Sequence, residues 1–542
     1  MLSDEGDALG GQATPAPHDA SDSRRLALST AFFSLATGLS RIAGLAREIV
    51  AAGYFGVKGP MSAFTIAFQV PNLIRSLFAD AALQAAFVPV FTEELEKRSR
   101  ADAFRVASAL VFVIAIGLGL VTALFVLLAP VLMPLFAPGF DQQLTDLTVN
   151  LARVLFPIVL LLGLSGLVVG VLNSFEHFAV PAIAPLFWNI AIIATLVVLT
   201  PQFSGDDRIY AYAIGVLIGT VVQLLLPLPW LRATGFRLTR YFNWRDERVL
   251  RVLKLMFPVT LGLGLINFNL SVDSIFATLI SDEAPAAIDK AFRIYMLPQG
   301  VFAVAVATVL FPTLSRFAAR EDPRGLRLTL ASGMRQLLLL LIPTAVAMLV
   351  LSRPVTQVIY QRGEFDASQT DLVSEALAYF ALSLPFAGVN LLLIRAFFSL
   401  QRPWVPTLIA LANLGVNAIL DALLYKPIGI GGIPLATAIV SLVTTLALAA
   451  VLRPSLEGLD GRRTLDVLVR VLMATGLLAL GTLAVREGLD GVLGDGFGGR
   501  LLLIALAGSV GMALYVAAVT ALRVREAAQL LSLARSGLAR LR

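Results

Sequence analysis

The 542-residue sequence has no cysteine, only two histidines, and charged residues at just 14% of its positions. Without cysteine the chain can form neither disulfides nor a thiolate metal site or nucleophile. The histidines, His18 and His177, have no metal-ligand partner at a useful spacing, so we expect no histidine metal site. Hydrophobic residues make up 58% of the chain and the mean hydropathy is +0.84, far from the values of soluble globular proteins. These proportions predict an all-α polytopic membrane protein.

Motifs for ATP-driven or metal-assisted chemistry are also missing. The sequence has no G-x-x-x-x-G-K-[ST] motif, which argues against direct ATP drive. It has no paired-carboxylate motif, which a membrane glycosyltransferase or phosphotransferase would need to hold a metal or to act as a base. The net charge of +6 would suit nucleic acid in a soluble chain, but membrane topology accounts for the basic residues here. We therefore expect a transporter and not an enzyme, with no nucleic-acid partner and no cofactor apart from a candidate coupling ion.

Apolar blocks recur along almost the whole chain. A hydrocarbon core of about 30 Å needs about 20 apolar residues in a helix, and fourteen blocks reach that length. We therefore predict fourteen transmembrane helices. They cover residues 27–55, 62–92, 106–136, 148–174, 179–200, 209–231, 252–280, 288–314, 336–360, 371–400, 404–424, 432–452, 465–485 and 499–522.

Lysine and arginine concentrate on alternate connections between these blocks. The positive-inside rule places such connections in the cytoplasm, so we expect both termini there, as an even helix count requires. The first 23 residues are acidic and lack the basic start and apolar core of a signal peptide. The expected organisation is a disordered cytoplasmic tail (1–23), a six-helix lobe (24–232), a basic cytoplasmic linker (233–251), a second six-helix lobe (252–455), two further helices (456–525) and a basic cytoplasmic C-terminus (526–542).

Short matches recur at a near-constant offset and indicate an internal repeat. The matches are Ala67-Phe68 with Ala291-Phe292, Pro89 with Pro312, Phe156-Pro157 with Leu384-Pro385, and Pro181 with Pro406, at offsets of 223 to 228 residues. This offset spans six predicted helices. Because six is even, the second copy keeps the orientation of the first, as in transporters built from parallel repeats. The repeat predicts two lobes that form a V around a central cavity, with two C-terminal helices appended.

Four arginines, Arg41, Arg47, Arg75 and Arg293, lie inside the apolar blocks. An arginine near mid-membrane costs about 3 kcal/mol on insertion scales, so it usually faces a protein-lined aqueous cavity. The guanidinium fork matches pairs of phosphate oxygens. The four arginines therefore predict a cationic cavity for a large phosphorylated anion. Snorkelling to the membrane interface is the alternative, above all for Arg47 and Arg293.

The first block, residues 26–55, would be about 45 Å long as one helix, which exceeds the apolar core. Arg41 and Arg47 lie about 120° apart on a regular helix. We therefore predict a bend or local unwinding near Gly44 that turns both arginines into one cavity. The loop GYFGVKGP that follows is the candidate outer gate. The predicted hinge or gate residues are Gly44, Gly53 and Gly56.

A second polar group consists of Asp273, Asn417, Asp421 and Thr437, on three different blocks. Asn417 and Asp421 are four residues apart and share a helix face. Oxygen ligands of this kind suit a hard cation. Ordinary hydrogen bonding between helices is the alternative.

Five segments carry a family resemblance: LSRIAGLAREIVAAGYFG, AFQVPNLIRSLFADAALQAAFVPVF, GVLNSFEHFAVPAIAPLFWN, LPQGVFAVAVATVLFPTLS and YQRGEF. They resemble the MurJ (MviN) family of lipid II flippases, within the multidrug/oligosaccharidyl-lipid/polysaccharide exporter superfamily. The resemblance implies that the chain moves undecaprenyl-diphosphate-linked peptidoglycan precursor, lipid II, from the cytoplasmic to the periplasmic leaflet of a bacterial inner membrane by alternating access. It also implies a lipid-tail groove beside the last two helices. The alternatives are a flippase for another polyprenyl-diphosphate saccharide and a cation-coupled drug exporter, although an exporter of cations should bury carboxylates.

The resemblance also implies roles for single residues. It places the diphosphate on Arg41, Arg47, Arg75 and Arg293, and sodium at Asp273, Asn417, Asp421, Thr437 and the carbonyl of Ile433. We expect Asp80, a retained acid, to pair with a cavity arginine when cargo is absent. Ser62 and Met296 stand where some members have acids. Their presence should leave the cavity more cationic, and it argues against a mechanism that uses those carboxylates for gating or proton coupling. The expected partners are lipid II and membrane lipids; we expect a monomer, with the cell-wall synthesis machinery as a candidate associate.

Overall fold

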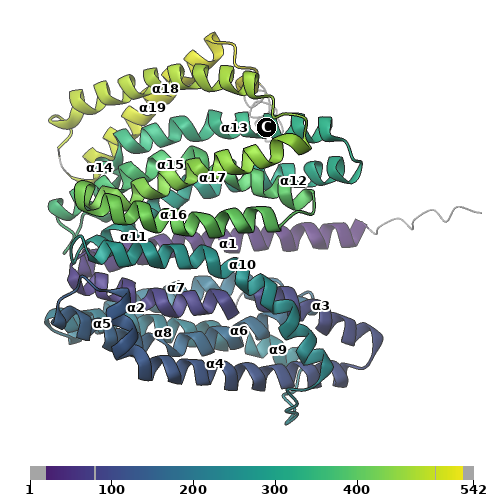
Figure 1. Ribbon diagram of the computed structural model, residues 1–542. Helices are drawn as coiled ribbons and strands as arrows, with labels where there is room; N and C mark the ends of the chain where they lie inside the picture. Colours follow the sequence, from purple (N-terminus) through teal and green to yellow (C-terminus); the bar gives the residue numbers. More distant parts are fainter. Residues whose placement is uncertain (1–19, 79–80, 495, 529–542) are drawn as a thin grey trace, which may run out of the picture.

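Figure 1 shows the computed structural model, in which residues 20–78, 81–494 and 496–528 are described. Almost all of these residues are helical, and no strand occurs among them. Ten of the described segments are long and apolar enough to cross a membrane, which confirms the prediction of an all-α polytopic membrane protein. They are Arg100–Phe136, Gln142–Ser174, Ala179–Gln202, Gly205–Ala233, Ala284–Ala319, Pro323–Val350, Ala367–Ser399, Trp404–Ser455, Gly461–Asp490 and Phe497–Ala521.

The helices of the first 233 residues, here called the first group, are connected by short turns. They are α1 (Ala20–Phe55), α2 (Gly59–Phe78), α3 (Ala81–Lys97), α4 (Arg100–Phe136), α5 (Gln142–Leu155), α6 (Pro157–Ser174), α7 (Ala179–Leu199), α8 (Tyr210–Leu225) and α9 (Leu228–Ala233), with the 3-10 turns η1 (Thr200–Gln202) and η2 (Gly205–Ile209).

A long helix, α10 (Glu247–Thr278), follows, and the helices after it are here called the second group. They are α11 (Ala284–Pro298), the π-helical turn η3 (Gln299–Ala303), α12 (Val304–Ala319), α13 (Pro323–Val350), α14 (Ser352–Tyr360), α15 (Ala367–Ser399), α16 (Trp404–Ile428), the 3-10 turn η4 (Gly429–Gly431), α17 (Gly432–Ser455), α18 (Gly461–Asp490) and α19 (Phe497–Ala521).

In Figure 1 most helices of the two groups lie on opposite sides of α10. In Figure 1, α2–α9 are below α10 and α12–α19 are above it. Helix α1 packs along α7, whereas α10 packs against α2 and α3 on one side and α16 on the other. Helix α10 therefore contacts both groups.

Helix α1 is continuous from Ala20 to Phe55, so local unwinding near Gly44, one of the two predicted forms, is wrong, while a bend there stays a prediction. Gly44 instead lies at the contact with α7, where an added Cβ would be 3.9 Å from the amide group of Asn189. Asn189 reaches across to α1 and donates a hydrogen bond to the Ser40 carbonyl at 3.5 Å. The glycine thus serves close helix packing, and the helix keeps its own backbone hydrogen bonds.

All fourteen predicted blocks fall on helical segments of the described residues, but several, such as 148–174 and 336–360, each take in two helices. That all fourteen cross a membrane stays a prediction. The bounds differ most for block 336–360, because α13 begins earlier, at Pro323. Asp322 caps that start by accepting a hydrogen bond from the Gly325 amide at 2.8 Å, and proline suits the first helical position. The predicted tail lies outside the described residues up to position 19, and residues 20–23 belong to α1.

Helices α18 and α19 pack on each other and on α13. The Tyr515 hydroxyl on α19 donates to the Leu339 carbonyl on α13 at 2.6 Å. Beyond α19 the chain stays against the bundle, since Glu526 is 2% exposed and accepts a hydrogen bond from Arg335 at 2.6 Å. The first residues of the predicted basic C-terminus, 526–542, are therefore packed, while 529–542 lie outside the described residues.

Candidate functional site

Loops of the two groups meet at one end of the bundle. They are residues 53–59 and 361–369, here called the closed end. The Glu364 amide donates to the Gly53 carbonyl at 2.9 Å, and the Val57 amide donates to the Gln369 side-chain oxygen at 3.0 Å. Gln369 is buried, so its hydrogen bond is shielded from water. These bonds join the end of α1 directly to the start of α15.

Two glycines permit this close approach. Gly56 and Gly363 both have a φ of +61°, which residues with a side chain rarely adopt. A Cβ on Gly363 would overlap the Gly53 carbonyl, and a Cβ on Gly56 would overlap the Gln369 side chain. The predicted gate residues Gly53 and Gly56 thus lie in a close contact between the groups, whereas Gly44 packs against α7 within the first group.

Polar side chains reinforce the closed end. Lys58 pairs with Glu364 at 2.7 Å, and Arg208 lies 3.6 Å from the same carboxylate. The hydrogen bond from Lys58 holds the pKa of Glu364 below its usual range. Ser62, expected as the replacement of a family acid, is fully buried, and its hydroxyl accepts a hydrogen bond from the Ala286 amide at 3.2 Å. Ser62 therefore joins α2 to α11.

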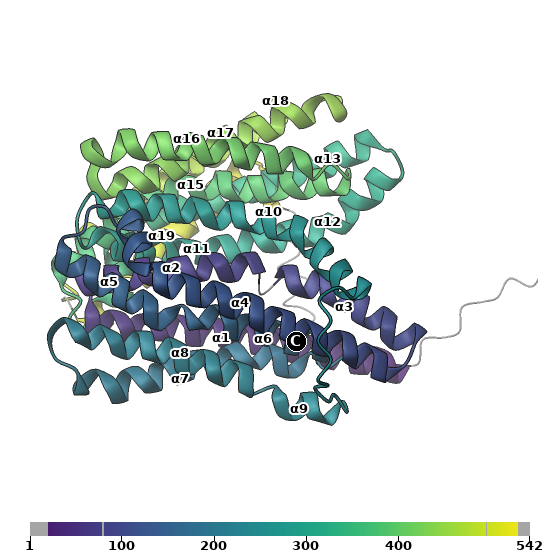
Figure 2. The ribbon, with the colours of Figure 1, turned by 60° about the horizontal axis from the view of Figure 1, so that its bottom comes forward.

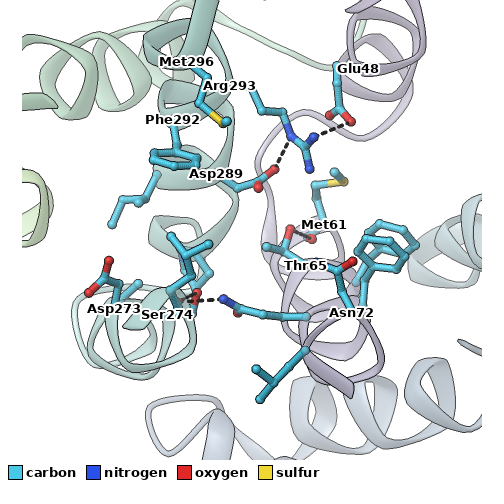
Figure 3. A pocket seen from close by; sticks show the side chains of 18 of the residues that line it. Glu48, Met61, Thr65, Asn72, Asp273, Ser274, Asp289, Phe292, Arg293 and Met296 are labelled. Atoms are coloured by element: carbon cyan, nitrogen blue, oxygen red, sulfur yellow. Dashed lines mark hydrogen bonds and ion pairs between the residues drawn. The ribbon is translucent and has the colours of Figure 1, made fainter. Parts of the chain in front are cut away.

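A cavity of about 260 Å³ opens beside this contact, between α2, α10 and α11 (Figure 3). The aromatic lining residues are Phe64, Phe68, Tyr212, Phe292 and Phe380. The polar and charged lining residues are Glu48, Thr65, Gln69, Asn72, Asn269, Asp273, Ser274, Asp289, Arg293 and Thr437. Gln69 bridges α2 and α10 by donating to the Leu270 carbonyl at 2.7 Å.

A buried ion cluster connects α1 to α11 at the cavity wall. Glu48 accepts from Lys290 at 2.5 Å and from Arg47 at 2.5 Å, and it pairs with Arg293 at 3.2 Å. Arg293 also pairs with Asp289 at 2.8 Å (Figure 3). Lys290 is completely buried, whereas the Arg293 side chain is 35% exposed. With all five groups ionised, the cluster carries three positive and two negative charges. Three of its members, Glu48, Asp289 and Arg293, line the cavity.

The sequence did not identify Glu48, Lys290 or Asp289 as site residues. Glu48 adjoins Arg47, and Lys290 lies three residues before Arg293. A charged residue inside an apolar block was therefore the signal that could have identified them. Their pairing was not visible, because 242 residues separate Glu48 from Lys290.

The four predicted arginines do not share one wall. Arg41 is exposed, and its guanidinium lies 3.7 Å from the position of a Cβ on Gly300 in the π-helical turn. Arg47 is 9% exposed and lies 4.7 Å above the Trp188 ring, so it does not snorkel to an interface. Arg75 belongs to α2, but its side chain lies outside the described part. Only Arg293 lines the described cavity.

The charged residues of the described lining are Glu48, Asp273, Asp289 and Arg293. Acids therefore outnumber arginine there, which differs from the strongly cationic wall that the sequence predicted. Two of the three acids, Glu48 and Asp289, are ion-pair partners of Arg293. Met296, at a position where an acid was expected from the family, is half exposed and also lines the cavity. Asp80 lies outside the described residues.

The second polar group also assembles. Asn417 donates to Asp273 at 2.5 Å and to Asp421 at 2.9 Å, and all three are buried. The Asn417 carbonyl oxygen and one Asp421 oxygen have no hydrogen-bond partner among the described residues. Thr437 donates to the Ile433 carbonyl at 3.3 Å within α17. No group of three histidine, cysteine or acidic side chains suited to a metal occurs in the described part, so any cation here would rely on amide, hydroxyl and carbonyl oxygens as well.

Comparison with known sequences identifies the family. The profile described as "Lipid II flippase MurJ" matches residues 51–496. A "Probable lipid II flippase MurJ" from Rhizobium tropici is 35% identical over 406 residues, which is 74% of this chain and 76% of that protein. The chain belongs to the MurJ family of lipid II flippases. A "Lipid II flippase MurJ" from Burkholderia cenocepacia is 31% identical, over 79% of this chain and 83% of that protein.

Solved structures agree on the fold. The structure titled "Lipid II flippase MurJ, inward closed conformation" matches with a TM-score of 0.74 and 24% identity, over 90% of this chain and 99% of that one. An inward-facing multidrug resistance MATE family transporter of the MOP superfamily matches with a TM-score of 0.64 and 17% identity, over 77% and 95%. MurJ family membership and the ten apolar segments make this chain a multi-pass protein of the bacterial inner membrane.

Proposed function

We propose that this chain is a lipid II flippase, a transporter that moves the undecaprenyl-diphosphate-linked precursor from the cytoplasmic to the periplasmic leaflet. Relatives named as lipid II flippases match this chain over most of their own length. The observation that carries the proposal is Arg293, which reaches the cavity while two carboxylates hold it. Diphosphate oxygens are the ligands that would replace those carboxylates, because they accept the same paired donors. The chain acts as a monomer on lipid II and contacts membrane lipids.

The orientation follows from charge. Basic residues gather at the end opposite the closed end, in the stretches 97–105, 232–254 and 316–335. By the positive-inside rule that end is cytoplasmic, so both termini are cytoplasmic and the closed end is periplasmic.

Fourteen crossings in two six-helix lobes that form a V account for the helix order. The repeated positions support this arrangement, since Pro181 and Pro406 both lie near the start of a helix, α7 and α16. Pro89 and Pro312 both lie inside a helix, α3 and α12. The remaining two helices, α18 and α19, would flank a groove for the lipid tail.

Cargo binding would act on the contact between α1 and α11. A diphosphate on Arg293 competes with Glu48, and Glu48 is the group that ties α1 to α11 through Lys290 and Arg293. Displacing it weakens one tie beside the closed end, so cargo would favour the outward-open state by its differential affinity. Arg41, Arg47 and Arg75 would complete the diphosphate site as the lobes rock.

A monovalent cation, sodium, is the proposed coupling ion at Asp273, Asn417 and Asp421. The two buried oxygens without a hydrogen-bond partner support it, because such atoms are rarely left unpaired. Bound there, the ion would supply positive charge between two carboxylates. Asp273 also lines the cavity, so the ion site and the cargo site would share α10.

A cation-coupled drug exporter is the second candidate, favoured by the three carboxylates in the cavity lining and by the MATE-type fold. It predicts that an organic cation such as ethidium is extruded by cells that overexpress the chain. The flippase predicts no such extrusion. A flippase for another polyprenyl-diphosphate saccharide is the third candidate for the same cavity.

The deciding experiment is rescue of a bacterium depleted of its lipid II flippase. The parent chain and Arg41→Ala, Arg75→Ala and Arg293→Ala would be expressed, with Arg320→Ala, an exposed arginine at the end of α12, as the matched control. We expect rescue by the parent and the control, failure of the Arg41, Arg75 and Arg293 variants at equal membrane levels, and precursor retained inside. No rescue by a well-inserted parent would refute lipid II as cargo and favour another polyprenyl-diphosphate saccharide.

A further inference from the structure

The segment that joins the two groups has an unusual surface. It covers residues 230–245, from the end of α9 to just before α10, and contains no acidic residue. Four of its large apolar side chains are exposed, with exposed arginines between them. The apolar side chains are Trp230 (44%), Leu238 (56%), Phe242 (52%) and Trp244 (52%), and the arginines are Arg232, Arg237, Arg240 and Arg245.

The segment is held in place by the first group. The Thr239 amide donates to the Ser108 hydroxyl on α4 at 3.0 Å. The Phe236 ring meets Phe104 edge to face at 5.3 Å between centroids. The contacts with α4 therefore fix the backbone of the segment. Binding of a partner would then cost less conformational entropy than binding to a flexible loop.

Neighbouring basic residues are engaged elsewhere. Arg248 pairs with Asp246 at 2.7 Å and with Glu94 at 2.9 Å, and the hydrogen bond from Arg248 holds the pKa of Asp246 below its usual range. Arg251 pairs with Glu93 at 2.9 Å. By contrast, none of the four arginines of the segment forms an ion pair within the described residues, so their charge is available to an outside partner.

The position of the segment suits a membrane boundary. Figures 1 and 2 both show it beside α9 at the end of the bundle, next to the start of α4. The apolar segment Gly205–Ala233 ends within it. Tryptophan concentrates at the headgroup level of bilayers, and basic residues there attract anionic headgroups.

We propose that residues 230–245 form a binding surface for the headgroups of anionic phospholipids. Trp230 and Trp244 lie among the headgroups, and the arginines bind their phosphates through paired N–H donors. The Arg245 guanidinium lies 4.7 Å above the Trp244 ring, which keeps charge and aromatic ring on one face. An exposed apolar patch rimmed by charged residues is typical of a membrane or protein contact. The surface is independent of which cargo the cavity takes.

The first test measures depth in a bilayer. Because the chain has no cysteine, a nitroxide can be attached at Leu238→Cys in the full chain, reconstituted in vesicles of phosphatidylcholine and phosphatidylglycerol. We expect collisions with oxygen to dominate over collisions with a water-soluble nickel complex. Arg320→Cys, exposed at the same end of the bundle, is the control and should show the reverse. A label at position 238 that is as accessible to nickel as the control would overturn the proposal and point to a soluble acidic partner.

The second test measures lipid retention. The chain would be extracted from equal mixtures of phosphatidylcholine and phosphatidylglycerol, and the retained lipids counted by native mass spectrometry. Arg237→Gln, Arg240→Gln and Arg245→Gln combined should lower the retained phosphatidylglycerol at least about threefold, because each basic residue near an anionic surface strengthens attraction about fivefold. Arg316→Gln, Arg320→Gln and Arg324→Gln combined remove the same charge at the same end and should change it less than about 1.5-fold. Equal losses in both triple variants would also overturn the proposal.

Discussion

The Lys290 ammonium lies 2.5 Å from the Glu48 carboxylate, and both side chains are almost completely buried. This pair joins α11 of the second group to α1 of the first, beside the closed end. A buried ion pair adds little net stability over an apolar pair, but removal of one partner is costly because the other charge stays buried. The contact is therefore better suited to hold one arrangement of the two groups than to stabilise the fold in general.

Lys290→Gln should destabilise the chain by about 3–5 kcal/mol, the usual cost of stranding a buried charge. Arg47 and Arg293 still contact Glu48, so we expect the lower end of that range. The measurement is unfolding of the purified chain in detergent. The double variant Glu48→Gln with Lys290→Gln removes both charges and should recover part of the loss; a double variant that is additive in its losses would contradict the pairing.

The sequence predicted helices well and partners poorly. The blocks with alternating basic loops were visible because a bilayer demands long apolar runs, and the blocks fall on helical segments. The polar group at Asp273 and Asn417 was visible too, since uncharged polar and acidic residues stand out in apolar blocks. The Lys290–Glu48 pair was not, because partners on helices far apart in sequence leave no spacing signal. The local unwinding predicted at Gly44 was wrong, since a glycine near a charge suits both a helix break and close packing.

Gly363→Ala should loosen the closed end. The positive φ of Gly363 and the overlap of an added Cβ with the Gly53 carbonyl leave no room for a methyl group, so the loops must separate. In a Lys58→Cys, Glu364→Cys background, which replaces the 2.7 Å ion pair in a chain free of other cysteines, cross-linking by a short bismaleimide reports closure. We expect cross-linking to fall several-fold with Gly363→Ala.

The matched control for that variant is Gly117→Ala, since a Cβ at Gly117 on α4 meets nothing within 4 Å. It should leave cross-linking unchanged. Equal cross-linking in both alanine variants would mean that the Gly53 and Gly363 backbones do not need to touch for closure.

Asp421→Asn should abolish a sodium-specific rise in thermal stability. A ligand that binds only the folded state raises the unfolding free energy by about 2.7 kcal/mol at a hundredfold excess over its dissociation constant, and the partnerless oxygens of Asn417 and Asp421 are the proposed ligands. The measurement compares unfolding temperatures in sodium chloride and choline chloride at equal ionic strength.

Asn413→Ala on the same helix is the control for this ion. Asn413 donates to Thr444 at 2.6 Å, away from the proposed ligands, so its loss should lower stability in both salts and keep the difference between them. If the parent chain shows no difference between the salts, and transport ignores the sodium gradient, sodium coupling is abandoned.

Glu526→Gln should release α18 and α19 from α13. Glu526 and Arg335 are both buried and lie 2.6 Å apart, and Asp460 holds the same guanidinium at 2.9 Å. Removing the Glu526 charge leaves Arg335 with only the partly exposed Asp460, so we expect a loss of about 3 kcal/mol and faster proteolysis between α17 and α18. Arg463→Gln is the matched control, because Arg463 is exposed and 3.6 Å from Glu526, a geometry worth at most about 1 kcal/mol. If both variants resist protease like the parent, apolar contacts with α13 hold the two C-terminal helices, and the ion pair does not stabilise their docking.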